Sequence, residues 1–165
     1  MEDSVDRIIA QWAQVHPDSD VGPMGVLGRL YRLTRLFERE LQDVFTEHGL
    51  QAGEFDILAT LRRADTDGNG LTAGQLADSA LVTSGAITNR LDRLLAKDLI
   101  TRQVDPRSRR TIRIALTSRG REIIDVALRD YLVNEKRLLS TLTTSQREQL
   151  EGLLRVLLHD RENQT

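Results

Sequence analysis

Positive charge is concentrated in one short stretch of a chain that is acidic overall. Residues 105–117, "DPRSRRTIRIALT", contain Arg107, Arg109 and Arg110, although the 165-residue chain has a net charge of -2. Residues 83–121 hold ten basic and three acidic residues, so this segment carries +7 and the remainder -9. A basic segment on an acidic body predicts a local face that binds a polyanion. The alternative is an ordinary solvated helix and turn, and charge alone does not decide between them.

Composition indicates an ordinary folded domain. Hydrophobic residues make up 39% and charged residues 29% of the chain, and 165 residues are most simply one domain. The absence of cysteine excludes disulfides, thiolate metal sites and thiol redox chemistry. The acidic start "MEDSVDRII" does not resemble a signal peptide, and no apolar run approaches membrane-spanning length. We therefore expect a cytoplasmic protein that spans no membrane.

Apolar residues at helical spacing predict helices before the basic segment. An extra helix is expected in residues 1–16, followed by a long helix over residues 24–49 that Gly49 ends, and by another from Gly53 to Ala64. The apolar positions of the first helix are Val5, Ile8, Ile9, Trp12 and Val15.

The next two helices predict a helix-turn-helix. Thr72 and Gln75 form a capping-box pattern that starts a short helix, and "SGAITNRLDRLLAKD", residues 84–98, follows after a brief turn. One face of this second helix is apolar, with Ile87, Leu91, Leu94 and Leu95. Its opposite face carries the small or polar residues Ser84, Gly85, Thr88 and Asn89, which could contact base edges.

A basic hairpin follows this helix directly. "LITRQV" and "TIRIAL" alternate as strands, and the "DPRSRR" between them is longer than a tight turn, so we expect it to project. A helix-turn-helix followed by such a hairpin is a winged helix. The recognition helix would then enter the major groove, while Arg107, Arg109 and Arg110 reach the DNA backbone or the adjacent minor groove.

The predicted fold is mainly α with a small β-hairpin wing: a winged helix-turn-helix over residues 53–117, flanked by dimerisation helices over residues 24–49 and 118–160. Two apolar stripes in residues 118–160 support the dimer: Ile124, Ala127, Leu128, Tyr131 and Leu132 form the first, and Leu150, Leu153, Leu154, Leu157 and Leu158 form the second. The alternative is that these stripes pack on their own subunit. We favour the interface, because so small a winged helix does not need such long flanking helices for its core.

Other chemistry has little support in the sequence. The loop "DTDGNG" copies the first half of an EF-hand, but Leu76 occupies the position that needs a bidentate glutamate, so we interpret it as a turn. His16, His48 and His159 have no metal-ligand spacing. With no nucleophile-base pair, phosphate loop or paired carboxylates evident, we expect neither an enzyme nor a cofactor.

Four residues could form a ligand pocket. Asp56 and Arg63 lie two turns apart on one predicted helix face, above a floor of small side chains. Arg102 alternates with apolar residues along a strand, where an arginine needs an anionic partner. Trp12 could close the pocket with an aromatic surface. The alternatives are that Trp12 only docks its helix and that the charged residues form structural ion pairs.

These motifs together resemble the MarR family of bacterial transcriptional regulators, over roughly residues 24–160. The resemblance rests on "LTAGQLADSALVTSGAITNRLDRLLAKDLITR", on the wing "DPRSRRTIRIALT" and on "SRGREIID". It implies a homodimer that binds palindromic double-stranded DNA and, usually, a small molecule that relieves repression. Two positions differ from the family pattern: Ser108 replaces an aspartate in the wing, and Asp98 replaces a glycine after the recognition helix.

The set Trp12, Asp56, Arg63 and Arg102 resembles the urate-responsive branch of this family, which has an extra N-terminal helix bearing a tryptophan. The resemblance implies a small anionic ligand, urate or a related purine or carboxylate, held by these residues. We expect Asp56 and Arg102 to pair in the free protein, and the bound anion to disturb that pair.

The sequence is therefore interpreted as a dimeric winged-helix repressor. The expected DNA-binding residues are Ser84, Thr88, Asn89 and Arg90 in the recognition helix, with Arg107, Arg109 and Arg110 in the wing. The alternative function is that of a helical interaction protein whose basic hairpin binds an acidic protein partner.

Overall fold

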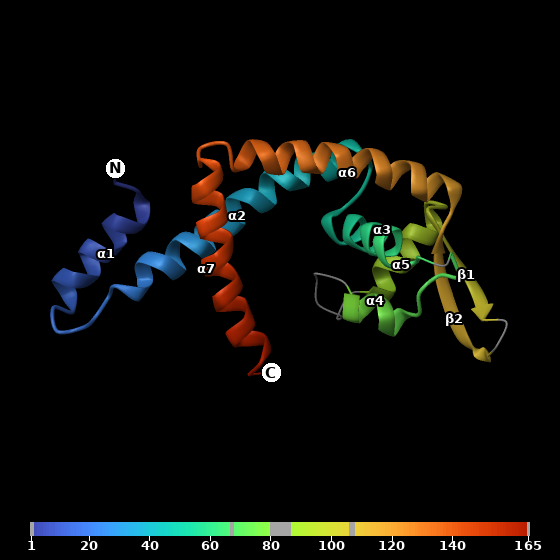
Figure 1. Cartoon of the computed structure of the whole chain (residues 1–165), viewed down its shortest axis with the longest axis horizontal. Helices are drawn as coiled ribbons and strands as arrows, with labels where there is room; N and C mark the ends of the chain where they lie inside the picture. Colours follow the sequence, from blue (N-terminus) through green and yellow to red (C-terminus); the bar gives the residue numbers. More distant parts are fainter. Residues whose placement is uncertain (1, 67, 80–86, 106–107, 165) are drawn as a thin grey trace. The chain divides into compact units, whose positions relative to one another are not determined.

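Seven helices and one β-hairpin form the part of the chain that the structure, a computed structural model, describes: residues 2–66, 68–79, 87–105 and 108–164 (Figure 1). The elements in chain order are α1 (Ser4–Val15), α2 (Pro23–Glu47), α3 (Ala52–Ala64), α4 (Ala73–Ser79), α5 (Ile87–Ala96), β1 (Ile100–Asp105), β2 (Ser108–Leu116), α6 (Ser118–Leu138) and α7 (Thr144–Glu162). The predicted fold class, mainly α with a small hairpin, is confirmed.

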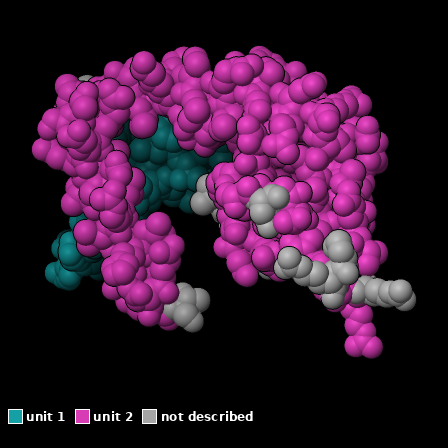
Figure 2. Space-filling view, turned by 45° about the vertical axis from the view of Figure 1, so that its right-hand side comes forward, with its two compact units in different colours: residues 1–43 teal, residues 44–165 magenta. Residues whose placement is uncertain are grey.

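The chain divides into two compact units, residues 1–43 and residues 44–165, which Figure 2 colours separately. The first unit contains α1 and most of α2, and the second contains the helix-turn-helix, the hairpin, α6 and α7. Each unit is described by itself below. The single domain over residues 1–165 stays a prediction.

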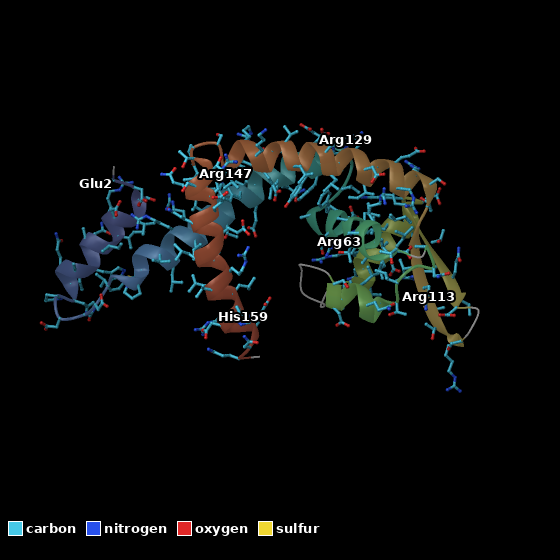
Figure 3. All side chains as sticks on the ribbon, viewed as in Figure 1. Glu2, Arg63, Arg113, Arg129, Arg147 and His159 are labelled. Carbon is cyan, nitrogen blue, oxygen red and sulfur yellow. The ribbon has the colours of Figure 1, made fainter. Side chains whose placement is uncertain are left out.

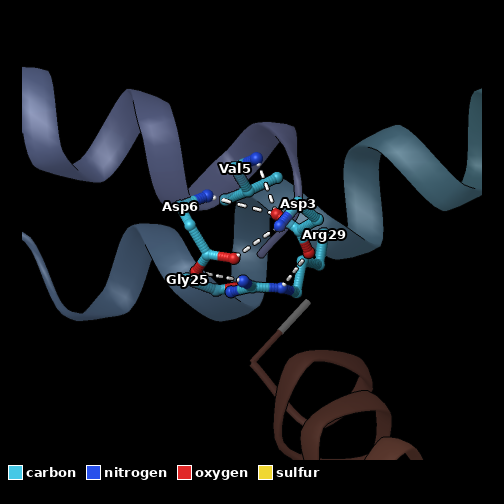
Figure 4. Close-up of polar contacts among 5 residues, drawn as sticks. All are labelled: Asp3, Val5, Asp6, Gly25 and Arg29. Carbon is cyan, nitrogen blue, oxygen red and sulfur yellow. Dashed lines mark hydrogen bonds and ion pairs between the residues drawn. The ribbon is translucent and has the colours of Figure 1, made fainter. Parts of the chain in front are cut away.

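An arginine fastens α1 to α2 in the first unit (Figure 4). Arg29 Nε lies 2.8 Å from Asp3 Oδ2 and its Nη2 lies 2.5 Å from Asp6 Oδ1. Asp3 also caps α1, because its Oδ1 accepts hydrogen bonds from the Val5 and Asp6 amides at 2.7 and 3.1 Å. The helix predicted within residues 1–16 is therefore present, with a capping box at its start.

The core of the second unit is built around α3, which packs against α4, α5, α6 and β2. Its largest fully buried apolar side chains are Ile57, Leu58, Leu61, Leu76, Leu94, Ile100 and Ile124. The predicted capping box of α4 is confirmed, since the Thr72 amide donates to Gln75 Oε1 and the Gln75 amide donates to Thr72 Oγ1. The loop before α4 also joins the hairpin through an isolated bridge between Leu71 and Ile114.

Helices α2 and α5 end in the same type of turn. The amides of Gly49 and Leu50 donate to the carbonyls of Thr46 and Phe45, each at 2.9 Å, and Gly49 has a φ of 67°. After α5, the amides of Asp98 and Leu99 make the equivalent pair of bonds, and Asp98 has a φ of 55°. Both turns are Schellman motifs, and only the second places a side chain in the left-handed region. Asp98 therefore makes the turn without the glycine that is typical of the family.

The hairpin is longer than the sequence predicted. Strand β2 begins at Ser108 rather than at Thr111, which leaves only residues 106 and 107 between the strands. The expected long connection over residues 105–110 is therefore wrong. Cross-strand pairing explains the difference: Asp105 pairs with Ser108, Val104 pairs with Ile112, and a bulge accommodates the residues between.

Helix α6 starts in close contact with the backbone that precedes β1. A Cβ on Gly120 would lie 1.9 Å from the Leu99 carbonyl oxygen, so only glycine fits there. Thr117 caps the helix by accepting the Gly120 amide at 2.9 Å, and its own hydroxyl donates to the Asp98 carbonyl at 2.9 Å. These contacts join the end of the recognition helix to the start of α6.

Helix α7 exposes its apolar stripe. It stands apart from the winged helix in Figure 1 and has no buried residue. Five leucines of the predicted stripe are exposed: Leu150, Leu153, Leu154, Leu157 and Leu158. Within the second unit the stripe therefore has little to cover it. No helix in the described ranges is both long and apolar enough to cross a membrane.

Candidate nucleic-acid interface

The recognition helix α5 separates a buried face from an exposed one. Ile87, Leu91 and Leu94 are buried against the core of the second unit. Thr88 and Asn89, two of the predicted DNA contacts, are both exposed. A hydroxyl and a carboxamide presented in this way can donate and accept hydrogen bonds at base edges. Ser84 lies outside the described residues.

Arg90, the fourth predicted contact on this helix, lies against α3. A Cβ on Gly53 would lie 2.4 Å from Arg90 Nε, so the guanidinium occupies the space that glycine leaves open. The residue is half-buried. Sequence reasoning missed this contact, because the missing side chain of Gly53 carries no chemical signal of its own.

Two further cations, Arg93 of α5 and Lys97 directly after this helix, converge on one buried carboxylate of α3. Glu54 is 0% exposed; its Oε1 lies 3.2 Å from Arg93 Nε and its Oε2 lies 2.7 Å from Lys97 Nζ. The Gln51 amide donates to Oε2 at 2.9 Å. Burial raises the pKa of Glu54, but Lys97, the Gln51 amide and Arg93 together outweigh it and hold that pKa below its ordinary value. Glu54 is therefore an ionised internal counter-ion, a role that the sequence reasoning missed.

The hairpin cations also have internal partners. Arg102 Nη2 lies 2.9 Å from Asp92 Oδ1 of α5. Arg113 Nε lies 2.5 Å from Asp105 Oδ2, and its Nη1 donates to the Gly70 carbonyl at 2.9 Å. Figure 3 labels Arg113, which projects from β2. Including Arg93 and Lys97, at least four of the ten cations in residues 83–121 are paired within the described part of the chain, so the charge available to DNA is smaller than the sequence count suggested.

The wing keeps at least one cation exposed. Arg110 lies on β2 and is exposed. Only the backbone of Arg109 is described, and Arg107 lies outside the described residues. At Ser108, where the family has an aspartate, the hydroxyl accepts a hydrogen bond from Thr111 Oγ1 at 3.0 Å. The carboxylate that holds an arginine in this hairpin is instead that of Asp105.

Two of the four predicted ligand residues lie together on α3. Asp56 is half-buried, and Arg63, two helical turns further along α3, is exposed. The fully buried Thr60 lies between them. The Arg63 guanidinium donates to the Ser79 carbonyl at the end of α4 (Figure 3). Arg102 contacts Asp92, so the expected pairing with Asp56 is wrong: the register of the hairpin against α5, which sequence does not give, provides a nearer carboxylate.

Trp12 belongs to the first unit, where it lines a groove of about 730 Å³ between α1 and α2. Apolar residues of both helices line the groove, with Arg32, Arg35 and Arg39 along it. Trp12 is 43% exposed and stacks on His16 at 5.5 Å between ring centroids. A tryptophan in this setting can pack against a flat ligand or against another protein segment.

The elements α4 and α5 with the β1–β2 hairpin define a winged helix-turn-helix, the fold class of many DNA-binding proteins. A model of the MarR family matches residues 48–111. The chain is 35% identical to the HTH-type transcriptional regulator PecS of Dickeya dadantii, over 91% of this chain and 90% of that protein. It is 31% identical to the multiple antibiotic resistance protein MarR of Salmonella typhimurium, over 80% and 90%.

Solved structures agree with these relatives. A mutant of E. coli MarR complexed with operator DNA is similar with a TM-score of 0.70 and 26% identity, over 85% of this chain and 99% of that one. The MepR-DNA complex of S. aureus shares the fold, with a TM-score of 0.72 over 81% of this chain and 96% of that one, at 24% identity. The chain belongs to the MarR family and is a transcriptional regulator.

Proposed function

We propose that this regulator is a repressor that binds a palindromic operator as a homodimer and is released by a small anionic ligand. The observation that carries the proposal is the exposed face of α5, where Thr88 and Asn89 stand opposite the buried Ile87, Leu91 and Leu94. Arg110 on the neighbouring hairpin supports phosphate binding beside this face. The apolar face of α5 is buried in the core, which leaves its polar side chains exposed to contact a DNA groove.

The DNA step is tested with a footprint on the DNA upstream of the protein's own gene, followed by affinity measurements on the protected duplex and on a random one. Asn89→Ala should weaken binding to the protected site by about 1–3 kcal/mol, because it removes a base contact, and should affect the random duplex less. Equal losses on both duplexes would reduce Asn89 to a residue that only positions the helix.

Dimerisation is supported by the leucine stripe of α7 and by the family. A chain that reads one half-site gains from a second copy, since two recognition helices can bind successive major grooves of a palindrome. The related E. coli MarR was solved with operator DNA. We infer that this chain acts on DNA in the same way, in the cytoplasm and without catalysing a reaction.

For the ligand step we propose Trp12 in the first unit and Asp56, Arg63 and Arg102 in the second. Arg63 offers a planar guanidinium that suits an anion such as urate, a related purine or a carboxylate. The ion pair between Arg102 and Asp92 supports a direct switch, because Asp92 belongs to the recognition helix itself. An anion that draws Arg102 toward α3 would release Asp92 and loosen α5. Such a ligand must bind the DNA-bound form more weakly than the released form.

The ligand step is tested by titrating urate, xanthine and small carboxylates into the protein-operator complex while following DNA release and Trp12 fluorescence. We expect urate to release the DNA and to quench Trp12, and Arg63→Ala to abolish both effects. Arg62→Ala is the matched control, because the neighbouring arginine pairs with Asp125 of α6 instead. Release by a carboxylate alone would exclude the purines, and no response to any of them would leave Trp12 a structural residue.

The alternative function, a helical interaction protein that binds an acidic partner through its hairpin, predicts no salt-sensitive affinity for duplex DNA. The internal pairing of Arg102 and Arg113 leaves the hairpin less cationic for either function and does not separate the two. A salt titration of duplex binding separates the two functions.

A further inference from the structure

An ion cluster ties the recognition helix to the turn between α2 and α3. Glu54, which is fully buried, contacts Arg93 of α5 and Lys97 directly after this helix, and it accepts a hydrogen bond from the Gln51 amide. Lys97 Nζ also donates to the Gly49 carbonyl at 2.8 Å, at the C-terminal end of α2. One carboxylate thus joins the start of α3, the end of α2 and the C-terminal half of α5.

This cluster constrains α5 in a way that its apolar contacts do not. Leu91 and Leu94 contribute hydrophobic burial, which has no preferred direction and tolerates small rotations of the helix. Charge-assisted hydrogen bonds are directional, and a buried carboxylate that loses its partners is costly. Arg93 and Lys97 are four residues apart and so share one face of α5. Rotating or sliding the helix would break both contacts at once.

The same helical row leads to the proposed DNA contact. Asn89 precedes Arg93 by four residues along α5, and the Lys97 amide donates to the Arg93 carbonyl at 3.1 Å, so Lys97 continues the same row directly after the helix. Because Glu54 holds Arg93 and Lys97, it also fixes the direction of Asn89.

We propose that Glu54 is a positioning residue for DNA recognition, which sets the rotation of α5, and that Arg93 and Lys97 are its counter-ions and not phosphate contacts. The inference rests on the proposed function, since it requires that α5 reads DNA. Glu54 itself touches no DNA, because it is buried inside the second unit.

The first test is Glu54→Gln, which keeps the shape of the side chain and removes its charge. Affinity for the protected operator should fall by roughly three- to thirtyfold, the range of typical energetic coupling between sites. Affinity for random duplex should stay the same or rise, because the variant has one negative charge fewer. Arg62→Gln is the control: it breaks the α3–α6 ion pair with Asp125 and should leave the ratio of the two affinities unchanged.

The second test is Lys97→Gln, which still leaves Glu54 with Arg93 and the Gln51 amide and so serves if Glu54→Gln does not fold. We expect operator affinity to fall while the slope of log affinity against log salt stays at the wild-type value. A lysine that contacts phosphate would instead lower that slope by about one unit.

Equal losses of operator and random affinity in Glu54→Gln, unchanged operator affinity in a folded Glu54→Gln, or a reduced salt slope in Lys97→Gln would each overturn the inference alone. A wild-type protein without salt-sensitive duplex binding would overturn the proposed function and this inference together.

Discussion

At the residue scale, five described cations of residues 83–121 fall into two groups with different physical roles. Arg93, Lys97, Arg102 and Arg113 have carboxylate partners within the chain, although Arg93 and Arg102 are also exposed, whereas Arg110 is exposed on the hairpin and has no carboxylate partner among the described residues. A cation paired with a carboxylate of the chain is less available to neutralise a DNA phosphate and so to release its counterions. We therefore expect Arg110 to contribute to the salt dependence of binding more than the four paired cations do.

Arg110 and Arg113 allow a direct comparison, since both lie on β2. Arg110→Gln should lower the salt slope of duplex binding by about one unit, through the loss of one phosphate contact. Arg113→Gln should keep the slope and lower the free energy of unfolding, because it leaves the buried Asp105 without this arginine. Duplex titrations at several salt concentrations, with urea unfolding of each variant, check both. The same slope change in both variants would contradict the division into two groups.

The ion pairs of Arg29 with Asp3 and Asp6, which join α1 to α2, should weaken in acid. Although desolvation raises the pKa of Asp3, the amides of Asp6 and Val5 and the Arg29 guanidinium outweigh it and lower that pKa. The Asp3 amide and Arg29 lower the pKa of Asp6. Both carboxylates therefore hold protons less tightly in the folded state, so their stabilisation is full above their ordinary pKa of 3.8 and is lost as pH falls through the lowered values.

Trp12 is the one tryptophan of the chain and lies on α1. Its fluorescence therefore reports the separation of α1 from α2 in acid. We expect the acid transition to move to higher pH in Arg29→Gln. Both proteins should carry His16→Gln, so that the ring stacked on Trp12 does not contribute to the fluorescence signal. An unchanged midpoint would show that Arg29 does not hold the carboxylates.

At the scale of elements, the sequence predicted most of the fold because its signals are local. Capping residues and helical periodicity located α1, α3 and α4 within a few residues, and the family and its regulatory class are confirmed by the relatives. The extent of β2 and the partners of Arg93 and Arg102 were missed. These depend on strand register and on contacts between distant segments, such as Glu54 with α5, which no local pattern records.

Because α6 approaches Leu99 closely, we expect alanine substitutions at two glycines to change the free energy of unfolding in opposite directions. Gly120→Ala would drive a Cβ into the Leu99 carbonyl and should destabilise the fold by at least about 1–3 kcal/mol. Gly152→Ala on α7 is the matched control, because no atom lies within 4 Å of its Cβ position. It should stabilise the helix by roughly 0.5–1 kcal/mol. Urea unfolding of both variants checks the pair, and equal stability would mean that α6 can move away from Leu99 freely.

At the scale of the whole molecule, α7 is the element whose burial is most incomplete. Leu154 and Leu158 are 39% and 59% exposed, which leaves a large apolar surface on one chain. A second copy is the occupant that the MarR family and the proposed palindromic operator favour. Dimerisation would then supply burial that the single chain lacks.

Changing Leu154 and Leu158 together to Glu should abolish dimerisation, because it places charges without partners in the interface. Operator binding should be lost at the same time, since a lone winged helix reads half of a palindrome. Val156→Glu is the control: it adds a charge to the same helix outside the leucine stripe. Sedimentation and duplex titration measure both effects. A double variant that remains a dimer and still binds would place this stripe inside one subunit.

Asp98 lowers the thermal stability of the fold, because a non-glycine residue is strained in the left-handed conformation. It has the left-handed conformation that Gly49 adopts at the same position after α2, and its carboxylate lies at the negative end of the α5 dipole. Asp98→Gly should relieve roughly 1 kcal/mol of strain and repulsion. The Tm should then rise by about 2–4 °C with operator affinity unchanged, which calorimetry and duplex titration would show, and a lower Tm would refute it. A lineage that moved to a warmer habitat could therefore gain thermal tolerance by one substitution that alters no DNA-facing side chain.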